Sequence, residues 1–330
     1  MNPNPPFSPI NQTMIEGFRL KGISDAPELQ VLIFLLVLLI YLLDVGVNLT
    51  MLLLVCLDVH LHTPMYFFLS NLAIIDISSS TTALHRIFIM IATQNHTVSK
   101  LACMTQLCFF CMLTSCEFSI LAAMSYDRYV AICRPLHYHT IMSRRLCGLL
   151  ASVTWIFGCL ELFPTALFTS RFTCYISNEI DHYFCDVLPI RDITCSDTSN
   201  LDFYILIVAN LNMTISLFLT VTPYVFIIAS ILRISSSAGR SKAFYTCSSH
   251  IAVVVMFYFS IVFQYILTVS GINMGSNKMS SLLNTAVIPM LNPIIYSLKN
   301  KDVKSALRRK QMKLNSLIKF ILLGNKLLQF

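Results

Sequence analysis

Seven long apolar stretches limit the folds that this chain can adopt. They cover roughly residues 29–56, 65–90, 101–126, 146–169, 202–232, 247–269 and 280–298. A helix needs about 20 apolar residues to cross a bilayer, and each stretch is close to that length or longer. Transmembrane β-strands would alternate polar and apolar side chains instead of forming continuous apolar runs. The sequence therefore predicts an all-α membrane protein built as a seven-transmembrane helix bundle.

The composition also indicates a membrane protein. Hydrophobic residues make up 56% of the chain and charged residues only 12%, whereas soluble proteins carry about 25% charged residues. With the N-terminus outside, the inner loops and tail hold fifteen Lys and Arg residues and the outer segments hold six. Lys and Arg accumulate on the cytoplasmic side of membrane proteins, so we expect this orientation, although Arg19 and Lys21 before the first span favour the opposite one. The net charge of +7 then reflects a basic cytoplasmic face rather than binding to nucleic acid.

We expect one seven-helix domain over residues 1–330. Residues 1–28 form an extracellular arm, residues 29–298 the helix bundle and residues 299–330 a cytoplasmic tail. The arm lacks the basic region that begins a cleavable signal peptide, so the first span is expected to direct insertion itself.

Several residues on the predicted outer side are candidates for covalent modification. An even number of cysteines in an oxidising compartment indicates two disulfides, but four cysteines allow three pairings and spacing does not choose among them. The four are Cys103, Cys174, Cys185 and Cys195. Two Asn-X-Ser/Thr sequons lie outside the spans, at Asn11 and Asn95, and are predicted glycosylation sites.

One face of the third span carries a stripe of residues that includes a carboxylate. After a first step of seven, the members are three or four residues apart, which places them on one side of a helix. They are Cys103, Phe110, Thr114, Glu117, Leu121, Met124 and Arg128. A carboxylate facing lipid is costly, so this face is predicted to point into the bundle.

Other polar residues occur at a similar depth in other spans. Asn48, Asp76 and Asn292 could join Glu117 in one buried polar cluster. Two carboxylates at close range repel each other unless one is protonated or a cation lies between them. The alternative is a set of interhelical hydrogen bonds that only holds the helices together.

Two spans carry charged or proline residues near their inner ends. Asp127 and Arg128 form a charge pair at the inner rim of the third span, where charge usually has a function. In the seventh span, Pro289 and Pro293 flank Asn292, with Tyr296 after them. Proline removes a helical hydrogen bond and permits a kink, so this span is either a moving element or statically kinked.

The sequence does not favour an enzyme or a transporter. No HExxH, P-loop or GxSxG motif occurs, so we expect no enzymatic activity, no metal and no cofactor. A transporter or channel would predict internal repeats or interrupted helix pairs, and no repeat is found.

Four stretches resemble motifs of the odorant receptors, a family within the rhodopsin-like G-protein-coupled receptors. In chain order they are LHTPMYFFLSNL at 61–72, MSYDRYVAIC at 124–133, KAFYTCSSH at 242–250 and PMLNPIIYSL at 289–298. They occur in the expected order, and the resemblance covers about residues 20–310. The third motif argues against the remaining alternative, a rhodopsin-like receptor for a lipid or a peptide.

The resemblance implies a disulfide pairing and a mode of signalling. Cys103 would pair with Cys185, and Cys174 with Cys195. A small odorant would bind, and the receptor would activate the olfactory stimulatory G protein and raise cyclic AMP, with Arg128 engaging the G protein once the sixth helix moves outward. The residues implied in coupling and activation are Asp127, Arg128, Tyr129, Tyr224, Asn292, Pro293 and Tyr296.

The resemblance also implies an outer-half pocket that takes a small, mostly hydrophobic odorant. Phe110 stands where aminergic receptors carry an aspartate, so a primary amine is not expected to be anchored at that position. The implied pocket residues are Phe110, Cys111, Thr114, Ser115, Val208, Asn212, Tyr258, Ile261 and Tyr265.

The same resemblance implies a multi-pass protein of the plasma membrane, in the cilia of olfactory neurons, that is helped to the surface by receptor-transport accessory proteins. Basic residues 300–310 predict a short cytoplasmic amphipathic helix on the membrane lipids. The apolar and basic residues that continue to Phe330 could lengthen this interfacial helix.

Overall fold

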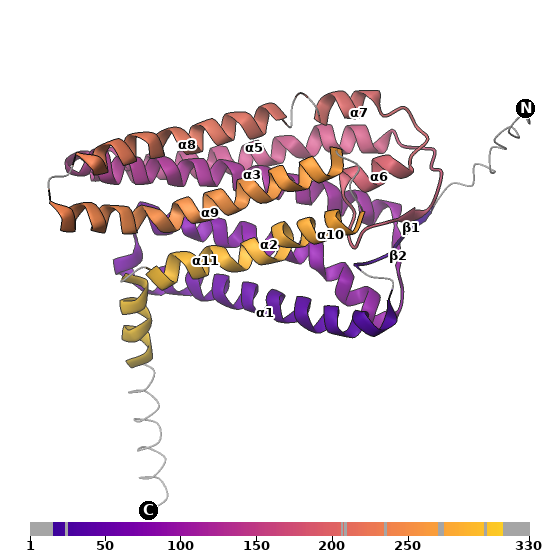
Figure 1. Cartoon of the computed structure of the whole chain (residues 1–330), viewed down its shortest axis with the longest axis horizontal. Helices are drawn as coiled ribbons and strands as arrows, with labels where there is room; N and C mark the ends of the chain where they lie inside the picture. Colours follow the sequence, from indigo (N-terminus) through magenta and orange to yellow (C-terminus); the bar gives the residue numbers. More distant parts are fainter. Residues whose placement is uncertain are drawn as a thin grey trace, which may run out of the picture.

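The structure is a computed structural model that describes residues 16–23, 26–205, 207, 210–233, 236–269, 274–299 and 302–312. Within these ranges, long helices lie side by side along one common direction (Figure 1). The predictions made for Asn11, for Val208 and for residues 313–330 lie outside the described residues, as does the side chain of Tyr265.

Among the described residues, seven helical segments build the bundle. They are α1 (Pro27–Leu57), α2 (Pro64–Thr93), α3 (Lys100–Cys133), α5 (Arg144–Ser170), α8 (Asn210–Leu232), α9 (Ser237–Val269) and the continuous segment α10 (Met274–Leu282), η4 (Leu283–Val287) and α11 (Ile288–Lys299). Five of these helices, α1, α2, α3, α5 and α8, are each long and apolar enough to cross a membrane, and α9 contains a shorter apolar helix, Cys247–Phe263. The predicted fold class, an all-α seven-helix membrane bundle, is confirmed.

Local sequence signals set where several helices begin. Ser99 and Ser143 lie at the N-caps of α3 and α5, and their hydroxyls accept the N–H groups of Ala102 and Leu146 at 3.2 and 3.4 Å. Such caps satisfy backbone donors that a helix leaves free in its first turn. In α1 and α2, proline occupies the first turn, where its missing N–H costs nothing.

Three helical segments differ in extent from the apolar stretches. Among the described residues, the fifth stretch, 202–232, overlaps α7 (Ser199–Tyr204), which begins before it, and α8. Helix α9 begins at Ser237 rather than at 247, and α10 begins at Met274 rather than at 280. Hydropathy marks only the part of a helix that lipid surrounds. A helix continues beyond that part wherever its backbone hydrogen bonds continue. Its first turns can therefore consist of polar residues, which hydropathy does not detect.

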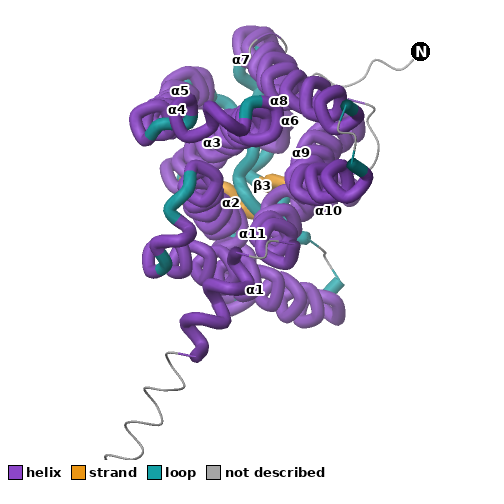
Figure 2. Tube along the Cα trace, turned by 90° about the vertical axis from the view of Figure 1, so that its left-hand side faces the viewer, coloured by secondary structure: helices purple, strands orange, loops and turns teal. Residues whose placement is uncertain are grey.

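Helix α3 is central to the bundle and packs against α2, α5 and α8. Figure 2 looks along the bundle from its inner end and shows α3 among these helices. The contact with α5 depends on Gly158, because a Cβ atom there would lie 2.3 Å from the Cys116 Sγ and 2.9 Å from the Met112 backbone oxygen. Only the missing side chain allows the two helices to come this close.

The outer end of the bundle carries a small three-stranded sheet that the sequence analysis did not anticipate. In this sheet, β1 (Gly17–Leu20) pairs antiparallel with β2 (Thr97–Ser99) and parallel with β3 (Glu179–Ile180). Phe18 and Leu20 are both 1% exposed. Part of the predicted extracellular arm is therefore packed into the outer face of the bundle (Figure 1).

At the inner end, a short helix over residues 302–312 turns away from the bundle axis (Figure 1). The Arg309 guanidinium donates to the Asp58 carboxylate at 2.7 and 3.0 Å, and the Lys310 Nζ donates to the Leu57 carbonyl at 2.6 Å. Arg309 and the neighbouring His60 hold the pKa of Asp58 well below its usual range. These contacts fix the start of the tail to the loop after α1.

Candidate ligand cavity and signalling elements

A cavity of about 800 Å³ lies between α3, α5 and α8. Its lining on α3 runs from Phe110 to Tyr126, which is about 24 Å at 1.5 Å per helical residue. At the outer end, Val187 of α6 (Val187–Ile193) and Tyr204 of α7 complete the wall. The volume suits a small organic molecule.

The inner half of this cavity is open and mostly apolar, with Ser119, Thr154 and Ser216 among its polar lining residues. Its lining on α8 includes Phe218 and Leu219, and these side chains are 68% and 53% exposed. Because α8 is a membrane-spanning helix, this opening faces lipid.

Part of the predicted pocket lines the cavity. Phe110, Cys111, Thr114 and Ser115 on α3 and Asn212 on α8 all belong to its wall. The Phe110 ring packs edge-on against Phe184 of the outer loop, with 5.0 Å between ring centroids.

The two described candidates on α9 are not among the residues that line this cavity. Ile261 packs against the bundle core. The Tyr258 hydroxyl shares hydrogen bonds with the hydroxyls of Ser216 and Thr220 on α8, and its ring lies 5.6 Å from that of Phe118. The sixth helix is thus joined to the cavity wall through Phe118 on α3 and through Ser216 on α8.

Glu161 on α5 lines the cavity, and sequence reasoning gave it no role. The Tyr204 hydroxyl donates to its Oε2, and the Asn212 Nδ2 donates to its Oε1 at 2.7 Å. The cavity therefore contains a carboxylate held by donors from two other helices. A glutamate near the edge of an apolar stretch gives no sign of the direction in which its side chain points, so this residue could not be found from sequence.

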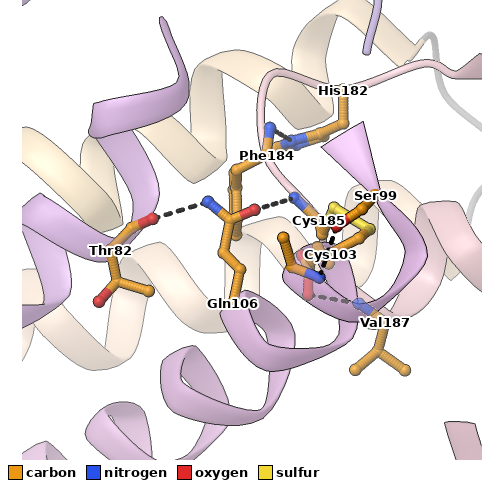
Figure 3. Close-up of a disulfide and its surroundings, with 10 residues drawn as sticks. Thr82, Ser99, Cys103, Gln106, His182, Phe184, Cys185 and Val187 are labelled. Atoms are coloured by element: carbon orange, nitrogen blue, oxygen red, sulfur yellow. Dashed lines mark hydrogen bonds between the residues drawn. A yellow bond between two sulfur atoms is a disulfide. The ribbon is translucent and has the colours of Figure 1, made fainter. Parts of the chain in front are cut away.

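The outer loop is fastened over the bundle by two disulfides, Cys103–Cys185 and Cys174–Cys195. These are the pairs that the family resemblance implies. Figure 3 shows Gln106 beside the first of them, with its Nε2 donating to the Thr82 carbonyl at 2.7 Å and its Oε1 accepting the Cys185 N–H at 3.0 Å. The loop that carries Cys185 is therefore fixed to both α2 and α3.

His182 lies in the same loop and is only 3% exposed. Its Nδ1 accepts the Phe184 N–H at 3.4 Å (Figure 3). Burial and, to a smaller extent, the nearby Lys278 ammonium lower the pKa of His182 to about 3. Lys278 itself donates to Asp181 at 2.6 Å, so the seventh segment is tied to the loop beside a neutral histidine.

The four residues predicted to form a polar cluster are all buried. Asn292 donates to both Asp76 oxygens at 3.1 Å, and Glu117 lies within electrostatic range of Asp76. Asn48 donates to Asp44 at 2.7 Å and to the Pro289 carbonyl at 3.2 Å.

Asp44 belongs to this group although the sequence analysis gave it no role. It is fully buried and also accepts the Ser80 hydroxyl. The cluster therefore links α1, α2, α3 and α11.

At the inner end of α3, Asp127 and Arg128 form an ion pair. The Tyr138 hydroxyl from α4 (Tyr138–Ile141) donates to the second Asp127 oxygen at 2.8 Å. Tyr129 lies on the neighbouring face, with its ring 6.0 Å from that of Phe226 on α8. Asp127 thus holds Arg128 beside the loop that follows α3.

A row of three rings lies next to this pair. The His250 ring lies 5.7 Å from that of Tyr224 and 5.8 Å from that of Tyr296. Within the described part of the chain, both tyrosine hydroxyls and both histidine ring nitrogens are buried without a hydrogen-bond partner. Pro293 lies within α11, one turn before Tyr296. Sequence reasoning found the tyrosines and Pro293, while His250 appeared only as part of a family motif.

A seven-helix bundle with a ligand-sized cavity between its helices and an ionic pair at the inner end of the third is the architecture of a membrane receptor. The family model described as olfactory receptor matches residues 37–313. The chain belongs to the olfactory receptor family, and it is a receptor rather than an enzyme.

Individual members of the family match almost the whole chain. Olfactory receptor 2AP1 of Homo sapiens is 44% identical over 93% of this chain and 99% of that receptor. Olfactory receptor 8G17 of Mus musculus is 46% identical over 91% and 98%, and olfactory receptor 1M1 of Mus musculus is 41% identical over 92% and 97%. The resemblance inferred from four motifs is confirmed, and the chain is a multi-pass membrane protein.

Proposed function

We propose that this receptor binds small, mostly hydrophobic odorants in the cavity between α3, α5 and α8, and that binding activates the olfactory stimulatory G protein and raises cyclic AMP. The observation that carries the proposal is the cavity itself, because five of the pocket residues expected from family position line one space of suitable volume. Apolar walls favour a hydrophobic ligand, while the few polar groups would orient it.

The proposed mechanism is a shift between two bundle arrangements. In the arrangement described here, Arg128 is paired with Asp127 and Tyr138 shares that carboxylate. A ligand that binds better to an arrangement with α9 displaced outward raises the population of that arrangement. Arg128 would then be free to contact the G protein, and the unpartnered hydroxyls of Tyr224 and Tyr296 could stabilise it in the new position.

The remaining parts of the proposal concern the surroundings of the receptor. We infer a location in the plasma membrane of olfactory cilia, contacts between the helix over 302–312 and membrane lipids, and accessory proteins that carry the receptor to the surface. Glycosylation at Asn95 is proposed because this residue is exposed, on the loop before β2.

The proposal is tested by Arg128→Ala in cells that express the stimulatory G protein. We expect odorant-dependent cyclic AMP to disappear while receptor at the cell surface, measured with an N-terminal tag, stays at the wild-type level. Arg171→Ala, at the exposed outer end of α5, is the matched control and should keep the response. A full response from Arg128→Ala would overturn the assigned role.

The cavity is tested separately. Asn212→Leu removes a donor from the wall without adding much volume, so the rank order of odorant potencies should change. If the order over a broad odorant panel stays the same, Asn212 does not contact the ligand.

A further inference from the structure

We propose that the odorants of this receptor include amines, and that Glu161 binds their ammonium group. This inference rests on the proposed function, since it names a ligand class for the same cavity. It differs from the usual placement of an amine anchor, because the carboxylate comes from α5 and not from α3, where Phe110 stands.

The charge of the cavity wall is the first argument. Glu161 and Asp186 are its acidic members, and among the described lining residues there is no lysine, arginine or histidine. The ion pairs found in the described part of the chain do not involve Glu161 either. A carboxylate in an apolar space is expensive unless a cation or good hydrogen bonds compensate it. The described wall compensates Glu161 with neutral hydrogen-bond donors only, so a cationic ligand would supply the opposite charge that this wall lacks.

The hydrogen bonds of Glu161 are the second argument. Tyr204 and Asn212 are neutral donors, and each binds a different carboxylate oxygen. Both oxygens therefore act as acceptors, and their orientation is fixed from two sides. A carboxylate has about four lone-pair sites, so roughly two remain for the N–H groups of a ligand. This is a pre-oriented acceptor for an ammonium group.

Asp186 is less suited to the same task. Its Oδ1 accepts the Val187 N–H at 2.7 Å, which caps the first turn of α6. Burial raises the pKa of Asp186, which favours its uncharged form. Glu161 is thus the carboxylate that we assign to the ligand.

The shape of the cavity supplies the third argument. Glu161 lies in its outer half, while the mostly apolar, open inner half extends along Phe118, Phe157 and Leu219. An aliphatic amine carries its charge at one end and an apolar chain at the other. Its ammonium group would contact Glu161, and its chain would contact the apolar residues of the inner half. At neutral pH such amines are protonated, as the Lys side chain is, with a pKa near 10.

The experiment compares straight-chain primary amines of four to ten carbons with alcohols and carboxylates of the same lengths. The first readout is cyclic AMP in cells, and the second is thermal stabilisation of the purified full-length receptor by each compound, which needs no G protein. We expect the preferred amine to be at least tenfold more potent than its matched alcohol. Glu161→Gln keeps the size of the side chain and removes its charge, so it should reduce this preference about tenfold to a hundredfold, the range expected for hydrogen bonds to charged groups.

The matched control is Glu179→Gln, the same substitution in β3 at the rim, where Glu179 pairs with the exposed Arg19. It should leave the amine preference unchanged. A purely structural role for Glu161 would lower the potency of amines and alcohols together and leave their ratio unchanged, and that result would overturn the proposal. Absence of stabilisation by any amine would also overturn it.

The two readouts separate this inference from the proposed function. A receptor that raises cyclic AMP with alcohols and ignores amines keeps the proposed function and loses the amine site. A receptor that is stabilised by amines through Glu161 without raising cyclic AMP keeps the amine site and loses the proposed coupling.

Discussion

The close contact between α3 and α5 at Gly158 leads to a prediction with a defined magnitude. Gly158→Ala adds one methyl group, which would lie 2.3 Å from the Cys116 Sγ and 2.9 Å from the Met112 carbonyl oxygen. The first neighbour is a side chain that can rotate, but the second is backbone within α3 and cannot move alone. Inserting a methyl group into such a packed contact typically costs about 1–3 kcal/mol of stability.

The control is Gly148→Ala in the same helix, where an added Cβ meets nothing within 4 Å. Replacing a helical glycine by alanine without steric conflict usually stabilises by about 0.4–1 kcal/mol, because it restricts the unfolded chain. The two variants should therefore differ by about 1.4–4 kcal/mol, with opposite signs relative to wild type. The measurement is the midpoint of thermal unfolding of the purified receptor in detergent.

A double substitution locates the conflict. In Gly158→Ala with Cys116→Ala the 2.3 Å contact disappears while the 2.9 Å contact with Met112 remains. The pair should recover part of the lost stability, so that the two substitutions are not additive. If Gly158→Ala is as stable as Gly148→Ala, α3 and α5 do not pack this closely. Because both helices line the cavity, its wall would then have a different shape.

Three further predictions concern the two ends of the bundle. The pKa of His182 is about 3 in the folded protein and near 6.5 when unfolded, so only the unfolded chain takes up a proton between these values. The contribution of His182 to the free energy of unfolding is therefore fully present above pH 6.5 and falls as the pH is lowered, by about 2 kcal/mol at pH 5. The unfolding midpoint of His182→Gln should accordingly fall less between pH 7 and pH 5 than that of the wild type. Asp58→Asn removes the carboxylate that binds Arg309, so amides of residues 302–312 should exchange hydrogen faster, while equal exchange would show that the ion pair does not hold this helix. Gly17→Ala places a Cβ 2.6 Å from the Val98 carbonyl, so amides of Thr97–Ser99 should lose protection, and unchanged protection would contradict the packing of β1.

The course of the chain through the membrane could be predicted because lipid leaves a strong signal in the sequence. Continuous apolar runs, such as 101–126 within α3 and 146–169 within α5, are needed wherever a helix contacts lipid over its length. The sheet at the outer face could not be predicted in the same way. Its strands have two to four residues and pair segments far apart in sequence, so no periodic pattern marks them.

The direction of polar side chains was the harder part of the site. The stripe on α3 was predictable because seven residues at helical spacing define a face. Glu161 and Asp44 are isolated polar residues in α5 and α1. A single residue has no periodic pattern from which the face that it occupies on the helix could be predicted. Their roles follow from partners on other helices, Tyr204 for Glu161 and Ser80 for Asp44, and such partners become visible only once the helices are packed.

The arrangement of the cavity also constrains how a ligand could act on the sixth helix. The described part of α9 does not line the cavity, so a bound molecule would have to act on it through other helices. Phe118 on α3 is one such contact, since it lines the cavity and its ring lies 5.1 Å from that of Phe257 on α9. Ser216 lines the cavity and shares a hydrogen bond with the Tyr258 hydroxyl on α9, and Thr220 holds the same hydroxyl at 3.2 Å. A ligand that rotates or displaces the Ser216 hydroxyl would weaken one of the two hydrogen bonds that the Tyr258 hydroxyl shares with α8. Since Tyr224, one turn further inward on α8, lies beside His250 on α9, a small change at Ser216 would be passed along the same pair of helices toward Arg128.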